Sequence, residues 1–88
     1  MGNLAATNAV EQRVPADGYD LERQLRTAER RYAEARGAAD KAREEWRALS
    51  VHPKATADAI QAARGRFEAV AARCNRLRAT IEELEERL

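Results

Sequence analysis

The sequence predicts an all-α protein: a long antiparallel helical hairpin whose two helices form a two-helix coiled coil. Two heptad patterns of apolar or small residues, one in each half of the chain, run without a break. Only Ser50, Val51, His52 and Pro53 interrupt them. A connection of about four residues makes neighbouring helices antiparallel, so we expect the two patterns to face each other.

The first pattern predicts a helix over residues 20–50, with Asp20 as its N-cap. Its members follow one another in steps of four and three, a period that strands cannot produce. They are Leu21, Leu25, Ala28, Tyr32, Ala35, Ala39, Ala42, Trp46 and Leu49. Residues 1–19 contain few large aliphatic side chains. We expect them to form an N-terminal arm, either flexible or a short helix that ends before Pro15.

The second pattern predicts a helix over residues 54–88, after a loop at 51–53. Pro53 is tolerated in a first helical turn, and Thr56 offers a second possible N-cap. The pattern comprises Ile60, Ala63, Phe67, Val70, Cys74, Leu77, Ile81, Leu84 and Leu88. Matching large residues with small ones across the hairpin sets Trp46 opposite Ile60 and Ala39 opposite Phe67.

The composition indicates that oligomerisation or a partner stabilises the hairpin. A chain of 88 residues buries little of its surface on folding. Its hydrophobic residues make up 44% of the chain, but 20 of them are alanine, which adds little apolar area. Charged residues make up 35% at a net charge of +1, which is typical of solvated helices and not of a protein that coats nucleic acid.

The expected compartment is the cytoplasm. The single cysteine, Cys74, excludes an internal disulfide framework and a cysteine-based zinc site. The chain has no apolar run of membrane-spanning length and no secretory signal, so we expect no membrane partner.

Catalytic chemistry is not expected. His52 is the only histidine and has no acidic or cysteine residue spaced to share a metal, while Cys74 lies on the core pattern without a base beside it. Phosphate-binding loops and nucleophile motifs do not occur. We therefore predict a non-enzyme with no catalytic, cofactor-binding or metal-binding residues and no cofactor.

One rim of the hairpin is a candidate docking surface. Four arginines on this rim flank four alanines of the second helix. The arginines are Arg31, Arg66, Arg73 and Arg87, and the alanines are Ala55, Ala59, Ala62 and Ala69. Alanine lets another helix approach closely, so the alanines are dimer-interface candidates and the arginines are partner-binding candidates. The alternative is that the alanines are filler on an exposed helix face.

The predicted function is non-catalytic protein binding by a small adaptor, assembly factor, chaperone or inhibitor. We expect a homodimer, a four-helix bundle of two hairpins, and a protein partner with an acidic or helical surface. Trp46 is either a plug at the loop end of the core or an anchor for the partner. The alternative function is an accessory role with nucleic acid, because six basic residues between Lys54 and Arg78 oppose only Asp58 and Glu68.

Overall fold

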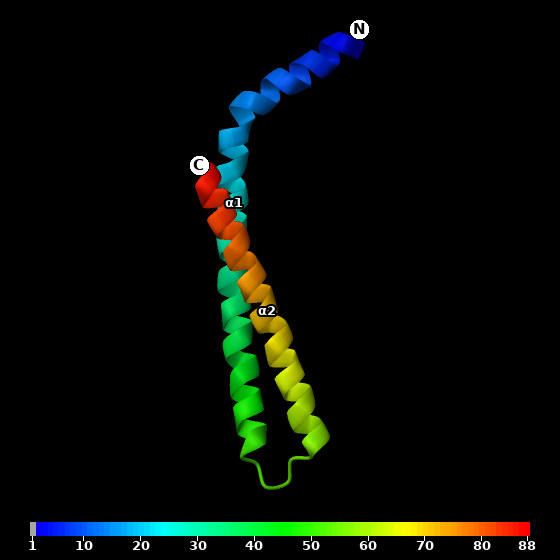
Figure 1. Ribbon diagram of the computed structural model, residues 1–88, viewed down its shortest axis with the longest axis vertical. Helices are drawn as coiled ribbons and strands as arrows, with labels where there is room; N and C mark the ends of the chain where they lie inside the picture. The colour runs from blue at the N-terminus through cyan, green and yellow to red at the C-terminus, as the bar shows by residue number, and fades with distance from the viewer. Residues whose placement is uncertain (1) are drawn as a thin grey trace.

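The structure is a computed structural model that describes the backbone of residues 2–88 and the side chains of residues 18–88. Two helices make up the fold: α1, Gly2–Ser50, and α2, Ala57–Arg87. They lie side by side and run antiparallel, and the loop joins them at one end of the molecule (Figure 1). The predicted all-α fold with two helices packed on each other is confirmed.

The N-terminal boundary of the first helix differs from the expectation. Helix α1 begins at Gly2, so the structure has no helix boundary at Asp20. The N-terminal part of α1 extends past the end of α2 and changes direction (Figure 1). A proline inside a helix removes one hydrogen bond and is the commonest cause of such a bend, and Pro15 lies within α1. That residues 1–19 act as a separate arm stays a prediction.

The loop is longer than expected, because α2 begins at Ala57 and not at Lys54. Thr56 is the N-cap: its backbone is extended, and its hydroxyl accepts a hydrogen bond from the N–H of Ala59 at 3.1 Å. The backbone N–H of Lys54 instead donates to His52 Nδ1 at 3.1 Å. The sequence offered two possible starts for the second helix, at Lys54 and after Thr56, and the structure has the second.

The seam between the helices consists of the predicted heptad positions. All of them are buried or half-buried except Leu88, which is 58% exposed. The buried residues of the core are mostly small: Ala28, Ala35, Ala63, Cys74 and Leu84. The larger apolar seam residues, such as Leu25, Ile60 and Leu77, remain half-buried. A pair of helices covers only one side of each seam residue, so the seam is closed mainly where side chains are small.

One contact between large residues across the seam goes beyond the pairing set by size matching. Trp46 stacks on Phe67, one heptad further along α2 than Ile60. The reason is the direction of helical side chains, which lean toward the N-terminus of their own helix. In an antiparallel pair the side chains of α2 lean toward the loop and those of α1 lean away from it. A residue of α1 therefore meets a side chain whose Cα lies further along α2.

The molecule is a rod of 71 × 25 × 15 Å with a radius of gyration of 20.8 Å. A compact domain of this length has a radius of gyration of about 12 Å. The chain exposes 6899 Å², whereas a compact protein of its mass exposes about 5,200 Å². The fold thus leaves more surface in contact with solvent than a compact single domain of this size does.

Candidate protein-binding surfaces

The alanine face is the side of α2 that contains Ala59, Ala62 and Ala69. Ala62 and Ala69 are exposed and Ala59 is half-buried. Ala55, the fourth predicted member, lies in the loop before α2, where its N–H donates to the carbonyl of His52 at 3.2 Å. The structure thus places three of the four alanines on one helix, with the fourth next to its start.

The four arginines predicted to flank this face differ in their surroundings. Arg66 donates to Glu45 of α1 at 2.6 Å, an ion pair that joins the two helices. Arg87 pairs with Glu83 of its own helix at 3.4 Å. Arg73 is exposed, and Arg31 lines a shallow groove on the same side of the hairpin together with Thr27 and Thr80. Arg66 and Arg73 are the two that border Ala62 and Ala69.

Trp46 lies half-buried at the loop end of the seam. Its ring stacks on Phe67 with centroids 5.6 Å apart, and the guanidinium carbon of Arg64 lies 5.9 Å from the ring centroid. One side of Trp46 also lines a surface hollow with Arg43, Arg47 and Ser50. The side chain therefore closes the end of the seam and presents part of its ring to solvent, so its two predicted roles are compatible.

The opposite side of the hairpin carries a cluster that the heptad argument did not find. The hydroxyl of Tyr32 accepts hydrogen bonds from Arg36 of α1 and from Arg78 of α2, each at 3.2 Å. Both guanidinium groups also lie over the tyrosine ring, at 6.0 and 5.9 Å from its centroid. The hydrogen bond from Arg78, and then the one from Arg36, lowers the pKa of Tyr32 below its ordinary value of 10.0.

Tyr32 was missed because a seam position was assumed to hold a purely apolar contact. The available signal was the pair of arginines at neighbouring rim positions, one on each helix. Heptad positions alone would set Arg78 opposite Glu29 across the rim. A tyrosine has a polar end that reaches out of the seam, and a hydroxyl there accepts from both rims.

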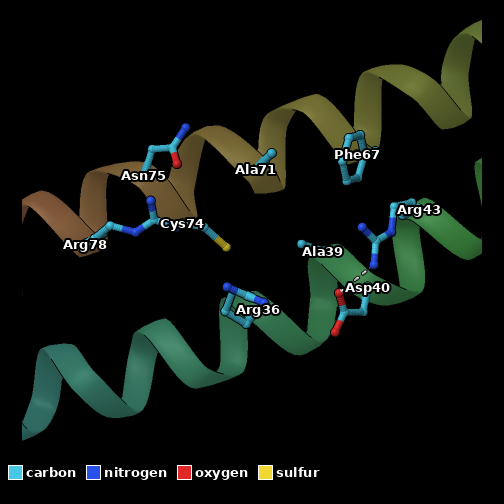
Figure 2. A pocket seen from close by; sticks show the side chains of 9 residues that line it. All are labelled: Arg36, Ala39, Asp40, Arg43, Phe67, Ala71, Cys74, Asn75 and Arg78. Carbon is cyan, nitrogen blue, oxygen red and sulfur yellow. Dashed lines mark hydrogen bonds and ion pairs between the residues drawn. The ribbon is translucent and has the colours of Figure 1, made fainter.

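A shallow groove of about 190 Å³ runs beside the Tyr32 cluster. Its floor contains the small side chains of Ala39 and Ala71, and the sulfur of Cys74 points into the space between the helices (Figure 2). The arginines Arg36 and Arg78 lie at one end of it. We call this side of the hairpin the Tyr32 face.

Arg43 of α1 and Arg64 of α2 lie at rim positions that face each other across the hairpin, and each has an acidic partner in its own helix. Arg43 pairs with Asp40 at 3.4 Å, and Arg64 pairs with Glu68 at 2.8 Å. These pairs are more than half exposed and each contributes at most a few tenths of a kcal/mol. They offset part of the repulsion across the rim without adding much to stability.

Two other kinds of site are not found in the described part of the chain. Its histidine, cysteine, aspartate and glutamate side chains form no group that could hold a metal ion. Neither helix has, over its described residues, an apolar stretch of the length needed to cross a membrane.

Comparison with known proteins does not place the chain in a family. The chain matches no protein-family model, no curated protein and no solved structure. What these surfaces do must be argued from their own residues.

Proposed function

We propose that this chain is a non-catalytic protein-binding module that acts through the surface of its helical hairpin. One observation supports this above all: the core closes on small side chains, while large apolar seam residues such as Leu25, Ile60 and Leu77 stay half-buried. Apolar surface that a fold cannot cover by itself is typical of a protein that binds another.

The alanine face is the proposed docking site for a helix of another protein. Side chains at a helix contact set the distance between the two axes, so Ala62 and Ala69 permit an approach at the short end of the usual 8–10 Å. Docking of a helix here costs little side-chain entropy on the alanine face, because alanine has no rotamers to lose.

Charge defines what kind of helix fits. Arg66 and Arg73 border the alanines, and Arg76 lies three residues beyond Arg73 on the same helix. Only Arg66 has an acidic partner among the described ion pairs. An acidic amphipathic helix would pair with the remaining guanidinium groups at the edge of the contact, where charges mainly set specificity and association rate.

The test is affinity capture with the wild-type chain beside Arg66→Glu/Arg73→Glu. The proposal expects a protein that binds the wild type and is lost from this variant. The matched control is Arg26→Glu/Arg30→Glu, which changes the charge equally at exposed positions of α1. If the variant and the control bind the same proteins equally, the alanine face is not the docking site.

A photo-cross-linking residue makes the assignment sharper. A benzophenone side chain at Ala62 lies on the alanine face, and one at Ala79 lies on an outer, exposed part of α2. The partner is expected to cross-link from position 62 and not from position 79. Cross-linking only from position 79 contradicts the assignment.

Nucleic acid is the second candidate. It is supported by the exposed basic residues Lys54, Arg73 and Arg76 along one stretch of the second half of the chain. It is weakened because Arg64, Arg66 and Arg78 already bind Glu68, Glu45 and Tyr32. Binding to phosphates is strongest at low salt, so retention of single- or double-stranded DNA or RNA at about 50 mM salt supports this function, and no retention removes it.

A further inference from the structure

The Tyr32 cluster holds two positive charges close to one atom. Arg36 comes from α1 and Arg78 from α2, and each donates to the same hydroxyl oxygen at 3.2 Å. Like charges within a few ångströms repel each other, and a neutral hydroxyl between them offsets little of that repulsion. None of the described ion pairs includes either arginine. The fold therefore brings together two cations that lack an anion.

The hydroxyl of Tyr32 also has a hydrogen bond left to make. A phenolic hydroxyl has two acceptor lone pairs and one proton to donate. The two arginines occupy both lone pairs, and the described hydrogen bonds give the proton no acceptor. Each guanidinium carries five N–H donors, of which one is used at this oxygen. The cluster thus presents donors from three groups to an acceptor that the described side chains do not supply.

The groove beside the cluster gives such an acceptor room. It measures about 190 Å³, and both arginines and Asn75 are part of its lining (Figure 2). The charged residues that line it are Arg36, Arg43 and Arg78 against Asp40, so the lining has a net charge of +2. Asp40 pairs with Arg43 at 3.4 Å. The excess positive charge therefore belongs to Arg36 and Arg78.

We propose that the Tyr32 cluster binds a phosphate group, either free phosphate or a phosphate monoester, at the end of this groove where Arg36 and Arg78 meet. One guanidinium from each helix donates to phosphate oxygens, and the Tyr32 hydroxyl donates its proton to a further oxygen. Phosphate carries a charge close to −2 at neutral pH, which matches the charge of the lining. The bound anion also offsets the repulsion between the two arginines.

The number and directions of the donors favour phosphate over a carboxylate. A carboxylate has two oxygens in one plane and pairs best with a single guanidinium, side by side. Here the two guanidinium groups come from different helices with the hydroxyl between them, so donors reach the site from three directions. A tetrahedral anion offers an oxygen to each of them, whereas one carboxylate leaves a donor without a partner.

Two exposed carboxylates near the cluster limit its affinity. Glu82 lies four residues after Arg78, and Glu29 lies three residues before Tyr32, so each is a neighbour on its helix surface. Because the site is open to solvent, we expect a dissociation constant on the order of 1 mM for inorganic phosphate. The inference does not depend on the proposed function, since the alanine face lies on the other side of the hairpin.

An NMR titration of the full chain with inorganic phosphate tests the proposal. Sodium chloride keeps the ionic strength constant, so that screening does not change during the titration. The side-chain Nε–Hε signals of Arg36 and Arg78 are expected to shift along one saturable curve, while that of Arg30 shifts little. In Tyr19→Phe, saturating phosphate is expected to raise the pKa of Tyr32, because an anion beside the hydroxyl disfavours its ionisation.

Two charge-matched variants locate the site. Arg36→Gln/Arg78→Gln is expected to weaken phosphate binding at least about tenfold, because both charged donors are lost. Arg30→Gln/Lys41→Gln removes the same charge at exposed positions of α1 outside the groove and is expected to change the dissociation constant less than about twofold. Circular dichroism checks that both variants remain helical. Equal weakening by the two variants overturns the proposal, as does a wild type without saturable shifts up to about 20 mM phosphate.

A gain of affinity provides a test that does not need the double variant. Glu82→Gln removes the carboxylate near Arg78 and is expected to tighten phosphate binding about threefold. Glu86→Gln, at an exposed position on the outer side of α2, is expected to leave it unchanged. Equal tightening by both variants would show that only net charge matters and would contradict the assigned site.

The identity of the anion is tested with two further probes. Acetate at the same ionic strength is expected to bind at least about tenfold more weakly than phosphate, and equal binding rules out the choice of phosphate. A short peptide with one phosphoserine distinguishes the two sources of the group. If the peptide binds more tightly than inorganic phosphate, the site belongs to a phosphorylated protein. If it binds no more tightly, the site belongs to free phosphate, and either result supports the proposal.

Discussion

The ring of Trp46 on α1 stacks on the ring of Phe67 on α2, with 5.6 Å between centroids and 29° between planes. This is the pair of large residues that fixes how the helices meet near the loop. It joins the two halves of the chain across a seam that otherwise buries mainly alanine and cysteine. The stability of the hairpin should therefore depend on this pair more than on the other contacts near the loop.

A double-mutant cycle tests this pairing. Trp46→Leu and Phe67→Leu are expected to show a coupling of about 1 kcal/mol in the free energy of unfolding, since stacked rings contribute roughly that beyond their buried area. The control cycle pairs Trp46→Leu with Ile60→Ala. Denaturation at one fixed protein concentration gives both values. Stronger coupling to Ile60 than to Phe67 would contradict the dominant role of the stacked rings.

The Tyr32 hydroxyl should ionise at a lower pH than an ordinary tyrosine. Its pKa is lowered by the hydrogen bonds from Arg78 and Arg36. Absorbance at 295 nm during a pH titration of Tyr19→Phe, which leaves Tyr32 as the remaining tyrosine, measures this directly. Arg78→Gln is expected to raise the pKa toward 10.0, whereas Arg76→Gln leaves it unchanged. An equal shift in both variants would mean that general charge, and not the hydrogen bond, sets the pKa.

The same shift predicts a pH dependence of stability. The folded-state pKa of Tyr32 lies below the unfolded value, so ionisation favours the folded state. The contribution is absent at neutral pH, grows as the pH rises through the folded pKa and is complete above the unfolded value near 10.0. The free energy of unfolding of the wild type relative to Tyr32→Phe should accordingly increase as the pH is raised from neutral to above 10.0. A constant difference would refute the linkage.

Alanine in place of Gly37 or Gly65 should stabilise the hairpin. A methyl group at either position meets nothing within 4 Å, and neither glycine has a positive φ. Each substitution is expected to add up to about 1 kcal/mol, because alanine loses less backbone entropy in a helix. Ala72→Gly, at another exposed position of α2, should cost a similar amount. Destabilisation by Gly37→Ala would reveal a close contact there in the assembled protein.

Removal of the cap at Thr56 should weaken the start of α2. The hydroxyl accepts from the N–H of Ala59, and Thr56→Ala is expected to cost about 1 kcal/mol while Thr56→Asp retains most of it. Thr80→Ala is the control, since that hydroxyl only donates to the Arg76 carbonyl within α2 and adds little. Equal effects at both threonines would indicate that α2 does not begin at Ala57.

The sequence was sufficient to predict the hairpin, because heptad spacing is a direct consequence of helix geometry. Every seam position from Leu21 to Leu84 is buried or half-buried as expected. The partners across the seam were harder to predict, because a repeat of seven residues fits several alignments. The lean of antiparallel side chains then decides which rings meet, as at Trp46 and Phe67.

The candidate surfaces were only partly predictable. The positions of Ala62, Ala69, Arg66 and Arg73 on one side follow from periodicity, and the structure also places Ala55 in the loop. The Tyr32 cluster needs the reach of two arginine side chains from different helices, which heptad positions do not encode.

Sedimentation equilibrium of the wild-type chain tests most directly the claim that this hairpin is one half of an assembly. The expected homodimer has a mass of twice the 9.8 kDa of the single chain at micromolar concentration. A mass of 9.8 kDa at all concentrations up to the high micromolar range, at low and at physiological salt, would contradict it.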